Sequence, residues 1–109
     1  MTNQPNIPYM CVSGIPPTFH SCYAVTLASD AATSLLGSLS ITPKALMIKA
    51  EEANGDAVYL CDSDATTTAN GFPIPDDSDN YVLIGVNHNN KPYAIADVAT
   101  EKVRVIALV

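Results

Sequence analysis

Alternation of apolar and polar residues is the clearest pattern in this chain, and it predicts β-strands. Between Ala45 and Glu52, alternate positions place Leu46, Ile48 and Ala50 on one side and Met47, Lys49 and Glu51 on the other. Successive side chains of a strand point to opposite faces, so we expect the Leu46 side to face a core. The same reasoning predicts four further strands, at Tyr23–Ala28, Tyr81–Val86, Pro92–Val98 and Val103–Val109.

The dipeptide Asn54-Gly55 is the strongest hairpin signal in the chain. Both residues tolerate the positive φ that a type I′ turn requires. We therefore expect this turn to pair the strand at Ala45–Glu52 with a strand at Asp56–Cys61.

Turn-forming residues predict the other connections. A polar loop over Asp62–Gly71 is followed by an apolar anchor within Gly71–Pro75, and His88–Lys91 is typical of a turn. The segment Asp30–Leu39 contains capping Asp and Ser residues, adjacent leucines and a glycine stop. This segment predicts one short helical turn.

The first 22 residues are typical of an extended arm. They contain four prolines, which lack backbone donors and fix φ, so neither a helix nor a central strand fits. The arm is too apolar for a solvated tail, so we expect it to contact its own domain or a neighbouring subunit. Its candidate partner-binding residues are Ile7, Tyr9, Met10, Val12, Ile15 and Phe19.

The predicted fold class is all-β, with a single small β-sandwich or jelly-roll-like domain at residues 23–109. An extended Pro-rich N-terminal arm at residues 1–22 precedes it. A chain of 109 residues is long enough for one such domain and buries roughly two thirds of its unfolded surface.

The charge balance argues against a nucleic-acid partner. The chain has 11 Asp and Glu against 5 Lys and Arg, and no cluster of basic residues that would neutralise phosphates. Only 15% of the residues are charged while 48% are hydrophobic, so the surface must be rich in apolar and small polar side chains. Such a surface suits a protein that packs against neighbours.

Membrane insertion and secretion are not expected. No segment approaches the roughly 18 continuous apolar residues of a membrane span. Residues Met1–Met10 lack the basic start and the apolar run of a signal peptide. We therefore expect the protein to be made and kept in a cytoplasm-like compartment, or assembled there.

The cysteines do not indicate a metal site. Cys11, Cys22 and Cys61 are odd in number and match no paired ligand motif, which favours reduced, partly buried thiols. Cys11, His20 and Cys22 offer three zinc ligands, but a structural site needs a fourth. We expect no metal and no cofactor.

The acidic loops and the hydroxyl residues do not indicate calcium binding or catalysis. Asp62 and Asp64 open a stretch like an EF-hand loop, but Thr67 stands where a Gly is required and no Glu closes the ring. The carboxylates at residues 76–79 are typical of a turn. Ser, His and carboxylate side chains are present, but without a nucleophile elbow or a phosphate-cradling glycine loop. We therefore expect that the protein is not an enzyme.

From Leu27 to Val109 the order of motifs resembles small structural proteins of tailed bacteriophage heads and virions. The resemblance rests on a Ser-Leu-Leu segment, the strand ALMIKAEE, an Ala-Asn-Gly-Asp turn, the strand AVYLCDSD, a Thr/Ala-rich loop closing on NGFPIP, and the strands YAIA and VRVIAL. It implies a β-sandwich that decorates or cements a capsid by binding the major capsid protein or other virion proteins. It also implies a symmetric homo-oligomer, for which we favour a trimer, without a cofactor and located on the capsid surface after assembly in the host cytoplasm. The arm at Met1–Cys22 is not part of the resemblance.

Two alternatives belong to other classes of protein. One is a carbohydrate- or receptor-binding jelly-roll module whose site lies in its loops. Tyrosines would supply its stacking surfaces, although most of them fall on predicted strands: Tyr9, Tyr23, Tyr59, Tyr81 and Tyr93. The other alternative is an adaptor protein of a phage tail or neck.

Overall fold

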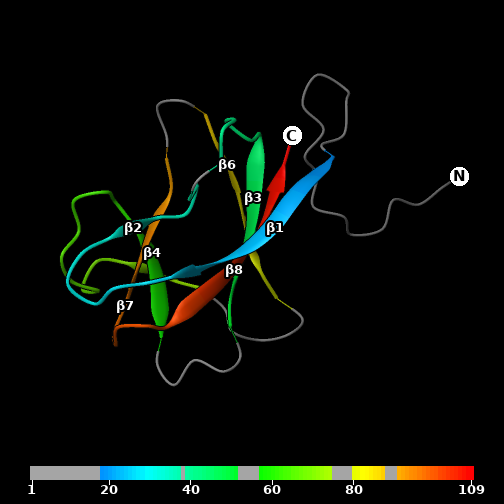
Figure 1. The fold of residues 1–109 in the computed structure, drawn as a ribbon. Helices are drawn as coiled ribbons and strands as arrows, with labels where there is room; N and C mark the ends of the chain where they lie inside the picture. The colour runs from blue at the N-terminus through cyan, green and yellow to red at the C-terminus, as the bar shows by residue number, and fades with distance from the viewer. Residues whose placement is uncertain (1–17, 38, 52–56, 75–79, 88–90) are drawn as a thin grey trace, which may run out of the picture.

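The fold consists of β-strands arranged in two antiparallel sheets (Figure 1). The computed structural model describes residues 18–37, 39–51, 57–74, 80–87 and 91–109. The first four-stranded sheet has the order β1 (Phe19–Thr26), β8 (Lys102–Leu108), β3 (Ala45–Ala50) and β6 (Val82–Gly85). The second four-stranded sheet has the order β2 (Thr33–Ser34), β7 (Tyr93–Ala96), β4 (Val58–Cys61) and β5 (Phe72–Pro73). These residues include no helix, and the predicted all-β class is confirmed.

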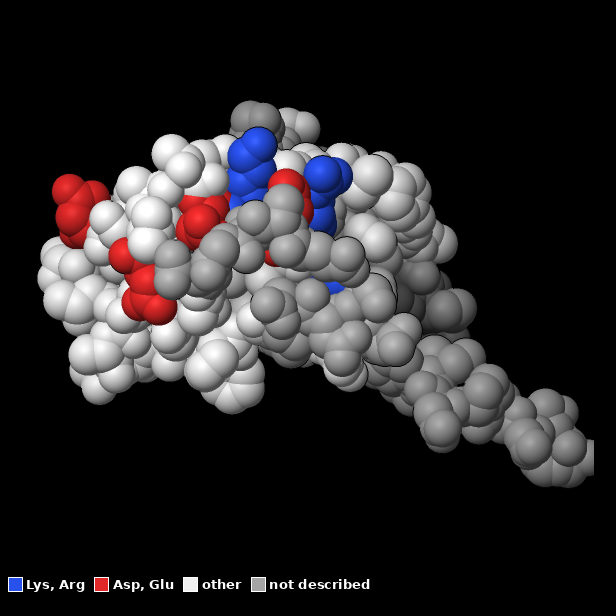
Figure 2. All heavy atoms as spheres, turned by 90° about the horizontal axis from the view of Figure 1, so that it is seen from below, with Lys and Arg blue, Asp and Glu red and all other residues white. Residues whose placement is uncertain are grey.

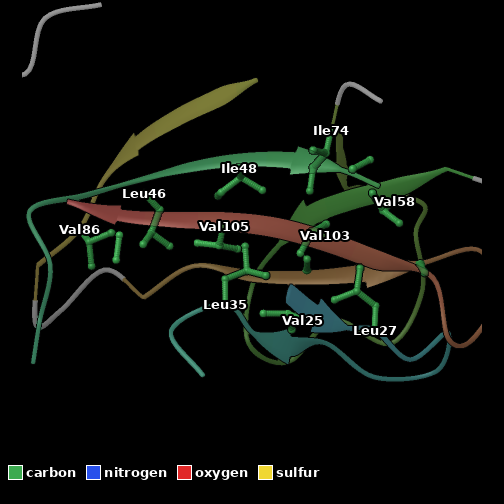
Figure 3. Close-up of a cluster of buried hydrophobic side chains, with 14 residues drawn as sticks. Val25, Leu27, Leu35, Leu46, Ile48, Val58, Ile74, Val86, Val103 and Val105 are labelled. Carbon is green, nitrogen blue, oxygen red and sulfur yellow. The ribbon is translucent and has the colours of Figure 1, made fainter. Parts of the chain in front are cut away.

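The core is built from the inward faces of both sheets (Figure 3). As predicted from the alternation, Leu46 and Ile48 of β3 are fully buried. Val103 and Val105 of β8 lie beside them, and Val58 of β4 joins the same cluster from the second sheet. The remaining fully or almost fully buried members of the cluster are Leu27, Leu35, Ala50, Ala94, Ala96 and Ala107.

The predicted hairpin between β3 and β4 is wrong, because the two strands belong to different sheets. β3 pairs with β8 from Ala45 to Ala50 and with β6 from Ala45 to Ile48. β4 pairs with β7 and β5 in the second sheet. Cross-strand pairs on both sides stabilise β3 more than a single local turn would. The dipeptide Asn54-Gly55 lies outside the described residues.

The predicted helical turn at Asp30–Leu39 is also wrong. Thr33 and Ser34 form β2, which pairs with Ala94 and Tyr93 of β7. The Leu35 N–H donates to the Pro92 carbonyl oxygen at 3.0 Å, and the Leu35 side chain is fully buried. Sheet pairing and burial of Leu35 therefore override the local helix signals, as tertiary context commonly does.

The first strand begins at Phe19, earlier than the expected start at Tyr23. Its pairing with β8 is interrupted by a bulge between Phe19 and Ser21, before a regular register from Ser21 to Thr26. The preceding part of the predicted arm, residues 1–17, lies outside the described residues. Within the described ranges, no helix is long and apolar enough to cross a membrane.

Candidate functional site

The first sheet carries an apolar row on the face that points away from the core. Strand register aligns Cys22 of β1 with Ile106 of β8, Ile106 with Met47 of β3, and Met47 with Leu83 of β6. These four residues, hereafter the outer row, alternate with the core-facing positions of their strands. Ile106, Met47 and Leu83 are half-buried and Cys22 is exposed, so the row is reached by solvent.

A second apolar row runs parallel to the outer row. Register aligns Phe19 with Leu108, Leu108 with Ala45, and Ala45 with Gly85. Phe19 is 63% exposed, which is unusual for a large aromatic side chain next to other apolar residues. Ala45 in this row is fully buried and Leu108 is half-buried. An antiparallel sheet with one face in water normally alternates apolar and polar residues, so the outer row and the exposed Phe19 ring indicate a contact surface.

Charged side chains border the outer row on its other side. Register aligns Ala24 with Arg104 and Arg104 with Lys49. Arg104 Nε donates to Glu51 Oε2 at 2.8 Å, which fixes the guanidinium beside the row. A shallow hollow of about 330 Å³ is lined by three members of the outer row and by polar neighbours: Cys22, Met47, Ile106, Lys49, Tyr81 and Arg104. The surface therefore combines an apolar centre with a polar border, as protein contact surfaces do.

Charged side chains are sparse over the face of the molecule drawn in Figure 2. Lys and Arg lie at the top of that view, Asp and Glu gather towards its left, and most of the described surface carries no charge. This distribution agrees with a chain of which only 15% is charged.

A second concavity lies in the loop between β4 and β5. It has a volume of about 520 Å³ and is lined by polar side chains and one aromatic ring: Asp62, Asp64, Thr66, Thr67, Asn70 and Phe72. Phe72 is 63% exposed, whereas Ile74 is the residue that anchors this segment in the core. The concavity therefore offers hydrogen-bonding groups next to an exposed ring.

Hydrogen bonds hold this loop against the second sheet. Asp97 accepts two of them, from the Thr68 hydroxyl at 2.9 Å and from the Tyr59 hydroxyl at 3.3 Å. The Ala32 N–H donates to the Ala65 carbonyl oxygen at 3.0 Å, which ties the loop to the segment before β2. Desolvation raises the pKa of Tyr59, and the charge and hydrogen bond of Asp97 raise it further. Tyr59 thus remains a protonated donor at neutral pH.

The described cysteines and histidine lie on strands of both sheets, with His20 and Cys22 on β1 and Cys61 on β4. Desolvation raises the pKa of the Cys61 thiol and the charge of Asp62 adds to this effect, so the nucleophilic thiolate is disfavoured. Cys22 lies on β1, His20 Nδ1 contacts the Ser21 hydroxyl at 3.0 Å, and Cys11 lies outside the described residues. Over the described ranges, no three metal-ligating side chains gather.

The predicted arm residues divide between described and undescribed parts of the chain. Phe19 lies at the start of β1, at the end of the second apolar row. The other five lie outside the described residues: Ile7, Tyr9, Met10, Val12 and Ile15. Sequence reasoning missed the outer row, although the run Val103–Leu108 gives a signal, because its apolar residues occupy both faces of one strand.

Comparisons of the chain with protein family models, curated proteins and solved structures found no match.

Proposed function

We propose that the chain is a virion structural protein that decorates a capsid and stabilises it by binding the major capsid protein lattice. In this proposal it acts as a homotrimer on the capsid surface, and it has no catalytic activity. The observation that carries the proposal is the apolar outer face of the first sheet. The motif order from Leu27 to Val109 supports the same class of protein.

The outer row supplies the contact in this proposal. Met47, Ile106 and Leu83 are half-buried, and a flat partner surface would bury them further. Burying apolar surface contributes about 25 cal/mol per Å². Arg104 and Glu51 at the border form an ion pair with each other. A capsid surface that covers them would therefore not leave either charge buried and unpaired.

Binding to capsids that lack this chain tests the proposal. The double variant Met47→Gln, Ile106→Thr keeps the size of the side chains similar but makes the outer row polar. We expect it to bind such capsids more weakly than the wild type and to protect them less against heat, because a ligand stabilises the state that it binds. Lys91→Gln, an exposed substitution away from the outer row, is the matched control. Capsids that are equally robust with and without the protein would refute the proposal.

The copy number in native particles separates decoration from the tail or neck alternative. A number that matches the capsid lattice supports decoration. A number that matches the rotational symmetry of the tail supports an adaptor, because subunits of a closed ring repeat with that symmetry.

Glycan binding is the second candidate function, and the concavity beside Phe72 favours it. An exposed aromatic ring can stack on the apolar face of a sugar, while Asp, Asn and Thr side chains bond to hydroxyl groups. The volume of about 520 Å³ lies within the range of small-molecule sites. Asp62 and Asp64 at this site favour neutral or amino sugars over acidic ones.

A panel of defined neutral, amino and acidic oligosaccharides tests this second function by calorimetry or NMR. Phe72→Ala should abolish binding, whereas Phe19→Ala should not, although both rings are 63% exposed. Binding that a chelator abolishes, or that survives Phe72→Ala, would contradict the site. Absence of binding to every sugar leaves decoration as the sole proposed function.

A further inference from the structure

β1 has a free edge. In the described part of the chain it pairs only with β8. The Leu27 N–H donates to the Glu101 carbonyl oxygen at 2.8 Å, continuing the regular register of β1 with β8. Backbone groups of an antiparallel strand alternate between its two edges. The N–H and C=O groups of Cys22, Ala24 and Thr26 therefore point away from β8, towards the free edge.

This edge lacks the features by which natural sheets avoid further pairing. Exposed edges are normally blunted by proline, lysine, a bulge or short length. From Ser21 to Thr26 the strand has no proline and no charged residue, and its bulge lies before Ser21. The edge is therefore a suitable template for one more strand.

A groove runs along the same edge. It has a volume of about 520 Å³ and is lined by β1 from Ser21 to Thr26 on one side, and by β2, Leu36, Gly37 and Leu39 on the other. The Tyr23 hydroxyl donates to the Leu35 carbonyl oxygen at 2.7 Å and holds the two sides together. Gly37 has φ +56°, which lets the backbone turn in the wall of the groove. An occupant of this groove would bond to β1 and pack apolar side chains on Leu36 and Leu39.

We propose that the groove binds the segment Tyr9–Ile15 of a second copy of this chain, as a fifth strand of the first sheet. This segment lies between Pro8 and Pro16 and contains no proline itself, so it can pair along its whole length. Its sequence, YMCVSGI, is mostly apolar and suits a groove lined by leucines. The inference rests on the part of the proposed function that makes the chain a homo-oligomer.

A second copy is a better donor than the same copy. The N–H and C=O groups of Thr18 both bond to Val109 at 2.8 Å, so the chain enters β1 already aligned with β8. Pro16 and Pro17 stand immediately before Thr18 and favour extended backbone over a tight reversal. Residues 1–17 can extend about 55 Å at roughly 3.3 Å per residue, which is enough to reach a neighbour.

The arm is also a better occupant than β1 of the second copy. In the second copy, β1 is tied to its own Leu35–Leu39 segment by the Tyr23 hydroxyl bond. If that β1 entered the groove, this segment would have to enter with it. Donation of an arm to the next copy is a head-to-tail contact. Such contacts form a ring, such as the proposed trimer, when the rotation between neighbouring copies closes, and an open filament when it does not.

Full-length variants with proline on either side of the contact test the proposal. Ala24→Pro removes an N–H that points to the free edge and leaves the β1–β8 ladder intact; Ala24→Thr keeps the N–H and is its control. Met10→Pro, Val12→Pro removes two donors from the arm. We expect wild type and Ala24→Thr to be oligomers by light scattering at micromolar concentration, and both proline variants to be folded monomers. If Ala24→Pro fails to fold, Thr26→Pro removes the next outward N–H.

Mixing the two proline variants is the decisive measurement. The arm of Ala24→Pro is intact, and so is the β1 edge of Met10→Pro, Val12→Pro. We expect one-to-one dimers in the mixture although each variant alone is a monomer. Self-pairing of β1 would instead leave the arm variant oligomeric and give no rescue, which overturns the proposal. A wild-type monomer also overturns it. A wild-type oligomer unaffected by any of these prolines overturns the arm contact alone and leaves capsid binding, measured separately, as it stands.

Discussion

Gly71 packs against the β4 strand at the point where the polar loop rejoins the second sheet. A Cβ added at Gly71 would lie 2.5 Å from Tyr59 Cβ and 3.1 Å from Tyr59 Cγ. Tyr59 Cβ is held by the backbone of β4, so it cannot swing away as the end of a long side chain could. We expect Gly71→Ala to lower the free energy of unfolding by about 1–3 kcal/mol, measured by urea denaturation.

Gly85 on β6 is the matched control for this prediction. The nearest atom to a Cβ added there is the Lys44 carbonyl oxygen at 3.9 Å, which is an ordinary contact. Gly85→Ala should change the free energy of unfolding by no more than about 0.5 kcal/mol. Equal effects of the two substitutions would show that the Gly71 contact does not constrain the loop.

Tyr23 makes the free energy of unfolding depend on pH in the alkaline range. Burial raises the pKa of Tyr23 above its ordinary value of 10.0, and its protonated hydroxyl donates to the Leu35 carbonyl oxygen. Above pH 10 the unfolded chain releases this proton more readily than the native protein, so the unfolded state binds fewer protons. The contribution of Tyr23 is therefore complete below pH 10 and is lost as the pH rises through the raised pKa.

Tyr23→Phe isolates this effect from that of Tyr59, whose pKa is also raised. At pH 7 the variant should be about 1 kcal/mol less stable than the wild type, because one partly buried hydrogen bond is lost. The difference between the two proteins should shrink above pH 10. A constant difference across that range, in denaturation curves taken at each pH, would contradict the assigned hydrogen bond.

Among the elements, β3 shows most directly how alternation divides one strand between core and surface. Ile48 is fully buried, whereas Met47 is half-buried in the outer row. Ile48→Ala should lower the free energy of unfolding by about 2–5 kcal/mol, because it leaves a cavity in the core. Met47→Ala should cost clearly less in the isolated protein and should weaken capsid binding instead. A larger thermal shift for Met47→Ala would mean that the two faces are reversed.

The sequence predicted which residues of a strand face the core better than it predicted which strands pair. Alternation identified Leu46 and Ile48 because the period of a strand is a local property. Pairing depends on contacts far apart in the chain: β1 pairs with β8, and β3 with both β8 and β6. The Asn54-Gly55 signal describes only a turn. It carries no information on whether β4 pairs with β3 or with β7.

The candidate contact surface was predictable only in part for the same reason. Composition indicated that much of the surface is apolar, and Phe19, which we named as a candidate contact residue, is exposed at the start of β1. The outer row joins Cys22, Met47, Leu83 and Ile106 from four strands, so it exists only once the register is known. Phe72 was grouped with a core anchor, but pairing of β5 with β4 leaves its ring exposed and buries Ile74 instead.

At the scale of the whole molecule, two separate surfaces divide the proposed roles. The outer row faces away from the core of the first sheet, while the groove lies along the β1 edge of the same sheet. Only β1 takes part in both. An oligomer joined at the β1 edge would therefore leave Met47, Leu83 and Ile106 of each copy open to a capsid. Assembly and capsid binding should accordingly be separable by mutation.

Truncation tests where the arm ends and the folded domain begins. Removing residues 1–17 deletes no described hydrogen bond and no member of the buried cluster, so the free energy of unfolding of the monomer should change by about 0.5 kcal/mol or less.

Removing residues 1–21 also deletes Thr18, whose N–H and C=O groups bond to Val109, and the pairing of Phe19 with Leu108. The longer truncation should cost about 1–3 kcal/mol, since each lost hydrogen bond contributes about 1 kcal/mol. Thermal and urea unfolding of both truncated proteins, at concentrations where the wild type is dissociated, measure this difference. If the shorter truncation already unfolds, residues 1–17 belong to the folded domain and do not form an arm for a neighbour.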